Sequence, residues 1–307
     1  MPVKNTTQDI GGKYVAPCVT CLGGALRVLV QLRATCLGGA ARRHATCLGG
    51  AALFCAALPS LARPPPRVYT GPMKTIGLLG GMSWESTAHY YSHINTLVKE
   101  RLGGLHSAEL ILVSVNFAPL EAMQAAGDWD AAGRVLAGKA RQAEAAGAEL
   151  LLIATNTMHR VAAAVEEAIS IPLLHIADAT AAAIMAAQEQ TRAAACVGLL
   201  GTRFTMEEEF YAGRLREKHG LEVLTPPAPD REIVHRVIYE ELVLGRILES
   251  SRAEYVRIVR ELARSGAQGV ILGCTEIGML LRSADVEVPL YDTTRIHAEA
   301  AVTAALD

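Results

Sequence analysis

The stretch that decides the fold is "GAQGVILGCTE" at residues 266–276, because a similar stretch, "GAELLLIATNT", occurs at 147–157. In both, a continuous apolar run leads directly into polar residues. A run that is apolar at every position is typical of a strand buried on both faces, as in a parallel sheet covered by helices. The pair therefore predicts two similar buried strands, each followed by polar side chains at its carboxyl end.

Two further pairs of segments extend this similarity. "TIGLLGG" at 75–81 matches "CVGLLGT" at 196–202, and "SIPLL" at 170–174 matches "EVPLY" at 287–291. The three pairs occur in the same order and at nearly constant spacing, which indicates a duplication. We expect an α/β protein of two similar α/β/α domains, with parallel sheets related by a pseudo-twofold axis.

Apolar runs alternate with helix-length stretches through the whole body of the chain, 73–307. The expected strands are 74–80, 109–116, 149–155, 172–176, 195–201, 221–224, 269–274 and 287–291. The expected helices are 84–101, 130–146, 157–169, 206–219, 231–264 (broken near Gly245) and 293–306. We expect a first domain at 73–178 plus 292–307 and a second at 179–291, with 118–130 forming a mobile loop over the cleft between them.

The first 72 residues differ from the rest in composition. They carry eight Lys/Arg and one acidic residue, and "TCLGGA" occurs three times at spacings that match no structural period. A proline run at 62–68 is typical of a linker. Two interpretations remain: an organelle-targeting peptide, or an extension upstream of a true start at Met73. In either case we expect residues 1–72 to be disordered.

Charge and cysteine content exclude several classes of function for the body of the chain. Its 21 Lys/Arg stand against 30 Asp/Glu, which argues against nucleic acid as the main partner. No apolar run reaches the ~20 residues of a membrane helix. Only Cys196 and Cys274 occur after residue 72, too few for a disulfide framework, so a cytoplasmic location is expected.

The polar residues after the two repeated strands predict an active site in the interdomain cleft. Ligands of open parallel sheets bind beyond the carboxyl ends of the strands. Thr155 and Cys274 correspond in the repeat, so a hydroxyl and a thiol would flank one small molecule. Such a pair suits inversion of a carbon centre, which needs proton removal on one face and delivery on the other. We expect helix N-termini to lower the thiol pKa from its usual ~8.5, although a buried cysteine can also be inert.

Three motifs resemble the aspartate/glutamate racemase family: "GLLGGMSWEST" at 77–87, "NTMH" at 156–159 and "GCTEI" at 273–277. The resemblance covers essentially all of 73–307, and the second motif is similar to the L-aspartate/glutamate-specific or broad-specificity branch. It implies an isomerase that interconverts L- and D-aspartate or glutamate, or a broader set of amino acids. It also implies a homodimer and a two-base mechanism without pyridoxal phosphate.

The resemblance and the strand ends together give the candidate site residues. Cys274 and Thr155 are the expected catalytic pair. The expected substrate contacts are Met82, Ser83, Asn116, Asn156, Thr157, Thr275 and Glu276. Asn116 could instead only cap a loop, Glu276 could be a first-turn helix acid, and His159 could either orient Thr155 or pack its helix.

The sequence departs from the family pattern at two positions. Most members carry cysteine where this chain has Thr155, so we expect Cys274 to be the competent base, Thr155 to relay a proton, and turnover to be faster from one enantiomer. Better-known aspartate racemases resemble "NFRE" where this chain has "NFAP" at 116–119, and use the arginine on the substrate's side-chain carboxylate. Ala118 therefore weakens the expectation of strict aspartate specificity.

Other functions remain open from the sequence. The same superfamily includes decarboxylases of malonates and maleate isomerases, and a non-catalytic amino-acid-binding protein would need the same pocket. "GLLGG" is not the G-x-G-x-x-G of a dinucleotide site. The body shows no metal-ligand spacing and no lysine in a motif that would suggest a Schiff-base cofactor, so neither metal nor cofactor is expected.

Overall fold

The computed structural model describes residues 71–188 and 196–307. The expectations for residues 1–70 and for position 195 lie outside the described residues. Among the described residues, no helix is long and apolar enough to cross a membrane. In the same ranges, no group of three or more His, Cys, Asp or Glu side chains is arranged to hold a metal ion.

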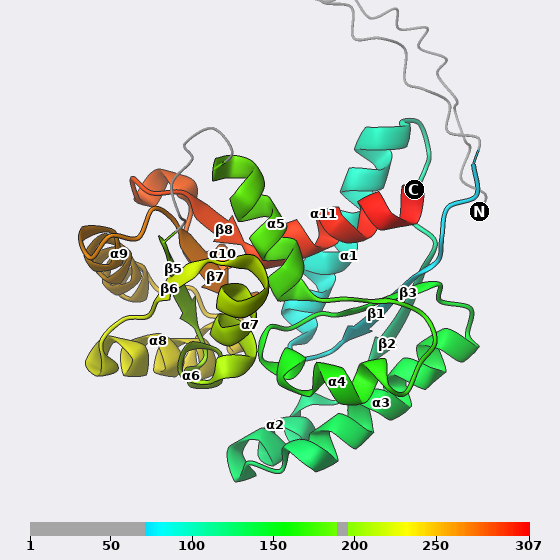
Figure 1. The fold of residues 1–307 in the computed structure, drawn as a ribbon, viewed down its shortest axis with the longest axis horizontal. Helices are drawn as coiled ribbons and strands as arrows, with labels where there is room; N and C mark the ends of the chain where they lie inside the picture. The colour runs from blue at the N-terminus through cyan, green and yellow to red at the C-terminus, as the bar shows by residue number, and fades with distance from the viewer. Residues whose placement is uncertain (1–70, 189–195) are drawn as a thin grey trace, which may run out of the picture. The chain divides into compact units, whose positions relative to one another are not determined.

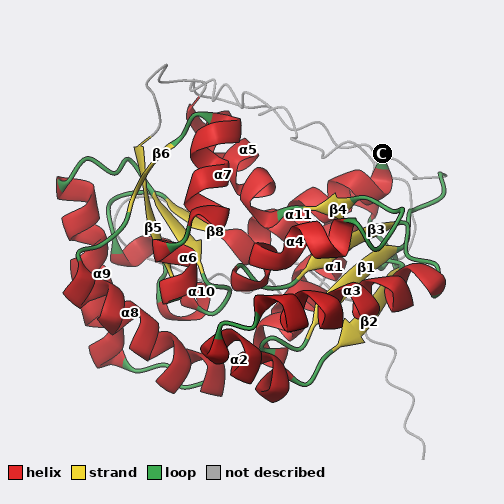
Figure 2. Ribbon diagram, turned by 60° about the horizontal axis from the view of Figure 1, so that its bottom comes forward, coloured by secondary structure: helices red, strands yellow, loops and turns green. Residues whose placement is uncertain are grey.

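Two four-stranded parallel sheets form the framework, and all eight strands expected from the sequence are present (Figures 1 and 2). The first sheet has the order β2-β1-β3-β4 and the second β6-β5-β7-β8, so the two halves share one topology. The strands are β1 Ile76–Gly80, β2 Leu110–Ser114, β3 Leu150–Ile153, β4 Leu173–Leu174, β5 Cys196–Gly201, β6 Glu222–Leu224, β7 Val270–Gly273 and β8 Leu290–Asp292. The predicted duplicated α/β fold is confirmed.

Helices cover both sheets (Figure 2). The α-helices are α1 Trp84–Leu102, α2 Phe117–Ala126, α3 Trp129–Ala145, α4 Ala162–Glu166, α5 Ile176–Gln188, α6 Arg203–Glu207, α7 Glu209–His219, α8 Ala228–Glu240, α9 Glu249–Arg264, α10 Ile277–Leu280 and α11 Thr293–Leu306. Three short 3₁₀ helices complete the description: η1 Thr157–Val161, η2 Leu242–Leu244 and η3 Ser283–Asp285. Because these helices bury both faces of the sheets, β1, β3 and β7 are buried at every position.

The long expected helix 231–264 is broken where the sequence indicated. Gly245 adopts a left-handed conformation with φ 70°, and it separates η2 from the segment that leads to α9. A residue with a Cβ atom adopts this conformation only at a cost, so glycine ends the helical path here.

The expected mobile loop at 118–130 is wrong. These residues form α2 and the first turn of α3. Gly127 ends α2 in the left-handed conformation, and the Asp128 side chain accepts a hydrogen bond from the Ala131 N–H to cap α3. Alanine-rich sequence with these two end signals favours two short helices over an irregular loop.

The last helix, α11, packs in the first half of the molecule, beside α1 (Figure 1). Its Ala298, Ala301 and Val302 share a buried cluster with Ile76 of β1 and Tyr90 of α1. The chain therefore crosses back after β8. The proposed domain boundaries at 178/179 and 291/292 stay a prediction.

Candidate active site

A small cavity lies where β3 and β7 end. Its volume is about 20 Å³, which is room for roughly one water molecule. It is lined from both halves by Met82, Phe117, Gln124, Thr155, Asn156, Thr157, Thr202, Ile238, Tyr239, Val243, Gly273, Cys274 and Glu276. The amino acid that the sequence predicts as substrate needs more space than this cavity provides.

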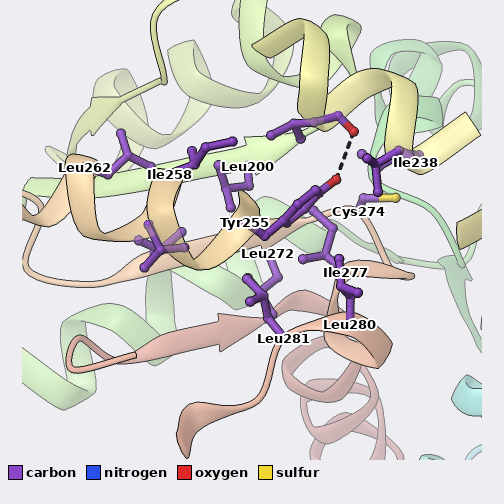
Figure 3. Close-up of a cluster of buried hydrophobic side chains, with 14 of the residues drawn as sticks. Leu200, Ile238, Tyr255, Ile258, Leu262, Leu272, Cys274, Ile277, Leu280 and Leu281 are labelled. Carbon is purple, nitrogen blue, oxygen red and sulfur yellow. Dashed lines mark hydrogen bonds between the residues drawn. The ribbon is translucent and has the colours of Figure 1, made fainter. Parts of the chain in front are cut away.

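Cys274 follows the last residue of β7 and forms one wall of this cavity. Its side chain lies at the edge of a buried apolar cluster, next to Ile238 and near Tyr255 (Figure 3). Gly273, immediately before it, has no room for a side chain, because a Cβ atom would lie 2.7 Å from the Leu200 carbonyl oxygen. The close approach of β5 to β7 therefore requires glycine at this strand end.

The Cys274 side chain is a protonated thiol that donates to Glu276 Oε2 over 3.0 Å. Burial raises its pKa well above the usual value, and the neighbouring Glu276 carboxylate raises the pKa further. The backbone N–H groups of Glu276 and Ile277 act in the opposite direction but do not prevail. The expected lowering of the thiol pKa is therefore wrong, because α10 is only four residues long and the desolvation of a buried thiolate outweighs its donors.

Glu276 connects the segment that follows β7 to the segment that follows β1 in the first half. Its Oε1 accepts from the Ser83 hydroxyl over 2.6 Å, and its Oε2 accepts from the Thr275 hydroxyl over 2.7 Å as well as from Cys274. Ser83 is the N-cap of α1 in the first half, and Glu276 precedes α10 in the second. The carboxylate is 2% exposed, so its three donors offset its loss of hydration.

Thr155 forms the corresponding wall after β3 and is, like Cys274, 8% exposed. Its hydroxyl has no hydrogen-bond partner within the ranges that the structure describes. Its carbonyl oxygen accepts from His159 Nδ1 over 2.8 Å, while His159 Nε2 accepts from the Ile176 N–H over 3.2 Å. One ring nitrogen donates and the other accepts, so His159 is neutral. It holds the backbone of Thr155 and leaves the hydroxyl available to a ligand.

The two residues after Thr155 add polar groups to the same wall. Asn156 donates from Nδ2 to the Thr293 hydroxyl over 2.9 Å, but its buried Oδ1 has no partner in the described part of the chain. The Thr157 hydroxyl lies 2.9 Å from the Thr202 hydroxyl. A buried acceptor without a partner is costly unless a ligand satisfies it, so Asn156 Oδ1 is suited to bind an ammonium group.

The structure brings most of the predicted site residues together. Those that line the cavity are Met82, Thr155, Asn156, Thr157, Cys274 and Glu276. Ser83 and Thr275 lie behind this wall, hydrogen-bonded to Glu276. Asn116 is exposed at the N-cap of α2 and does not line the cavity, and its expected substrate contact stays a prediction.

Sequence reasoning missed several wall residues, namely Phe117, Gln124, Thr202, Ile238, Tyr239 and Val243. Thr202 is the first residue after β5, so the rule that ligands bind beyond strand ends could have identified it. Ile238 and Tyr239 lie on α8, within an otherwise ordinary amphipathic helix. No local pattern distinguishes them from residues that face the core.

Comparisons with known proteins agree with this arrangement. The profile of the Asp/Glu/hydantoin racemase family matches residues 79–301. A candidate Asp/Glu racemase from Yersinia pestis is 54% identical, with a TM-score of 0.70, over 76% of this chain and 100% of its own. An aspartate racemase homologue from Pyrococcus horikoshii OT3 is 35% identical, with a TM-score of 0.66 and the same coverage of both chains.

A curated relative is more distant. The broad-specificity amino-acid racemase RacX of Bacillus subtilis is 20% identical over 240 residues, which make up 75% of this chain and 98% of its own. The family profile covers β2 to β8, the end of β1 and all the cavity walls described above. The matches to the Yersinia and Pyrococcus structures include the whole of those two chains. The chain belongs to the Asp/Glu/hydantoin racemase family.

Proposed function

We propose that this amino-acid racemase inverts Cα with Cys274 as its base, Glu276 as the acceptor of the thiol proton, and Thr155 as the proton relay on the opposite face. One observation carries the proposal: Cys274 and Thr155 lie in the walls of one cavity, at the ends of two equivalent strands. The Cys274 thiol is hydrogen-bonded to the Glu276 carboxylate, whereas the Thr155 hydroxyl has no hydrogen-bond partner among the described residues. Both groups are positioned by rigid sheet elements, which favours precise proton transfer.

The hydrogen bonds indicate where each proton is at the start of the reaction and where it moves. In the resting site the proton is on Cys274 Sγ and the charge is on Glu276. Transfer of that proton to Glu276 Oε2 creates a thiolate without changing the net charge of the site. The thiolate then takes the proton from Cα, and a proton from the Thr155 hydroxyl, replenished by water, reaches Cα from the other face. The pair of electrons left on Cα accepts that proton, so the substrate inverts without loss of any group. The proton held by Glu276 then returns to solvent, where it neutralises the hydroxide left by the water that refilled Thr155, and the resting site is restored.

The remaining wall groups suit the shared part of an amino acid. Asn156 Oδ1 lacks a hydrogen-bond donor, so it supports binding of the substrate ammonium. The hydroxyls of Thr157 and Thr202 lie within 2.9 Å of each other and can donate to the substrate carboxylate. Ser83 and Thr275 act indirectly, by holding Glu276 in place.

The asymmetry of the two ends gives the main test. A threonine hydroxyl is a far weaker base than a thiolate, so removal of the Cα proton is fast only from the enantiomer that presents it to Cys274. We expect exchange of the Cα hydrogen for solvent deuterium, followed by proton NMR, to be clearly faster from one enantiomer. The assay uses the full chain without added pyridoxal phosphate. Equal exchange rates from both enantiomers would reject this division of roles.

Deuterium exchange, measured together with CO₂ release and optical rotation, separates the rival functions. A related decarboxylase releases CO₂, whereas racemisation removes optical rotation without it. A maleate isomerase does not exchange the Cα hydrogen of an amino acid. A binding protein retains its ligand without any exchange. Independence from pyridoxal phosphate, a homodimeric assembly and a cytoplasmic location belong to this proposal, and the oligomeric state is measured directly by sedimentation.

A further inference from the structure

We propose that the substrate side chain is uncharged and that Gln124 is the residue that selects it. The inference rests on the proposed function and narrows its substrate class. It comes from the wall of the cavity beyond Cys274 and Thr155, where α2 supplies Phe117 and Gln124 and α8 supplies Tyr239.

The charge of the cavity wall does not suit a second carboxylate. Of the described residues, no Lys, Arg or His lines the cavity, while Glu276 contributes a negative charge. Helix α2 contains one charged residue, Glu121, which is also acidic. A substrate with an acidic side chain would bury two carboxylates but only one ammonium. A buried charge without a partner is strongly unfavourable, whereas an amide or apolar side chain carries no such cost.

The groups around Tyr239 show that the electrostatic potential at this wall is negative. Burial raises the pKa of its hydroxyl, and among its neighbours the carboxylates of Glu121 and Glu276 raise the pKa further. Arg203 opposes them, but it is exposed, does not line the cavity, and has its guanidinium 5.7 Å from the centre of the Phe204 ring. An added negative charge at this wall would therefore be repelled, and a neutral group would not.

Gln124 is the buried polar side chain best placed to recognise a neutral group. It is 3% exposed, its Oε1 accepts from the Tyr239 hydroxyl over 3.3 Å, and its Nε2 lies against the sulfur of Met158. A thioether is a weak acceptor, so the amide N–H can exchange this contact for a better one. A primary amide both donates and accepts, and it suits a side-chain amide or hydroxyl, while Phe117 and Ile238 accommodate its carbon atoms.

Matched substrates test the charge without changing the shape. L-asparagine and L-aspartate are nearly isosteric, as are L-glutamine and L-glutamate. We expect kcat/KM for Cα deuterium exchange to be at least about tenfold higher for the amides, because the acids bury an unpaired charge. Aspartate or glutamate reacting as fast as its amide would overturn the inference while leaving the racemase mechanism intact. Absence of exchange with all four and with the remaining common L-amino acids would overturn both.

Two variants assign the selectivity to its source. Gln124→Met keeps the length of the side chain but removes its amide, so we expect a loss of about three- to tenfold for asparagine and glutamine, and a smaller loss for L-methionine. Gln124→Arg supplies the missing cation, and the preference should shift toward aspartate. Arg203→Ala is the control for the cation that acts on Tyr239. A drop in aspartate turnover confined to Arg203→Ala would mean that Arg203 binds a side-chain carboxylate, which contradicts the proposal.

Discussion

The ends of β3 and β7 occupy equivalent places in two sheets of the same topology, yet their surroundings differ. Thr155 has an unbonded hydroxyl and a backbone held by His159, whereas the Cys274 thiol is bonded to Glu276 and packs against an apolar cluster. Both side chains are equally buried. The comparison shows that the duplication conserved the backbone positions of the two groups. Their proton chemistry is set by neighbours that the two halves do not share.

The largest effect is expected from removing the sulfur, which leaves Thr155 as the only group of the pair. Cys274→Ala should lower kcat by about 10²- to 10⁴-fold, the usual contribution of a general base. Steady-state racemisation and calorimetric substrate binding are the two measurements, and binding should remain. Glu276→Gln is the companion variant: it keeps the size of the side chain but cannot take the thiol proton, so it should also lower kcat. Normal turnover by Cys274→Ala would refute a role for the thiol.

A smaller effect is expected from making the two ends alike. Thr155→Cys places a thiol at both strand ends, so the exchange rates from the two enantiomers should converge. The slower direction should gain about 10- to 100-fold, less than the roughly 10²- to 10⁴-fold of a fully optimised general base, because the new thiol lacks a partner such as Glu276. Thr155→Ser is the matched control and should keep the asymmetry, because it retains a hydroxyl. If exchange stays equally lopsided in Thr155→Cys, the asymmetry has another origin than residue 155.

The smallest effect is expected from the residues that pack against the two strand ends, and it concerns the dependence of stability on pH. Thr155 rests on His159, which lies 4.5 Å from His175 and 5.9 Å from His297 between ring centres. His297 Nε2 donates to the Leu174 carbonyl oxygen over 2.8 Å, and its Nδ1 accepts from the Tyr90 hydroxyl over 2.9 Å. These three buried histidine rings lie in the first half, whereas Cys274 packs against apolar side chains and Tyr255. Acid should therefore weaken the Thr155 end first.

The sign of this pH effect follows from the pKa directions. Burial lowers the pKa of His175 to about 3 and of His297 to about 4, and it holds the pKa of His159 well below 6.5. Between pH 6.5 and these values the unfolded chain binds more protons, so the free energy of unfolding falls as the pH drops through this window. Each ring contributes up to about 1.4 kcal/mol per pH unit.

Urea unfolding at pH 7, 6 and 5 measures this dependence. His297→Gln keeps a side-chain donor but does not titrate, so its stability should fall less steeply with acid than that of the parent. His89→Gln removes an exposed histidine and should leave the slope unchanged. If His297→Gln leaves the dependence of the unfolding free energy on pH unchanged, the buried ring is already charged at these pH values.

The site was only partly accessible to prediction, for reasons that particular residues make clear. Thr155, Asn156 and Cys274 could be found because strand ends in a parallel sheet are predictable from apolar runs and the polar residues that follow. Asn116 satisfied the same rule, but α2 begins directly after it and turns it to the surface. The sequence pointed to Glu276 because it follows a strand end, but its hydrogen bond to Ser83 spans 193 residues and has no local signal.

By itself the sequence determined the duplicated parallel sheets, the break at Gly245 and the positions of the thiol and hydroxyl, because apolar periodicity, glycine conformations and strand ends are local properties. Only the tertiary structure decided that the thiol is protonated and bonded to Glu276, that His159 holds the Thr155 carbonyl, and that Gln124 and Tyr239 close the cavity. These properties depend on burial and on contacts between distant segments, which set the pKa and the shape of the site.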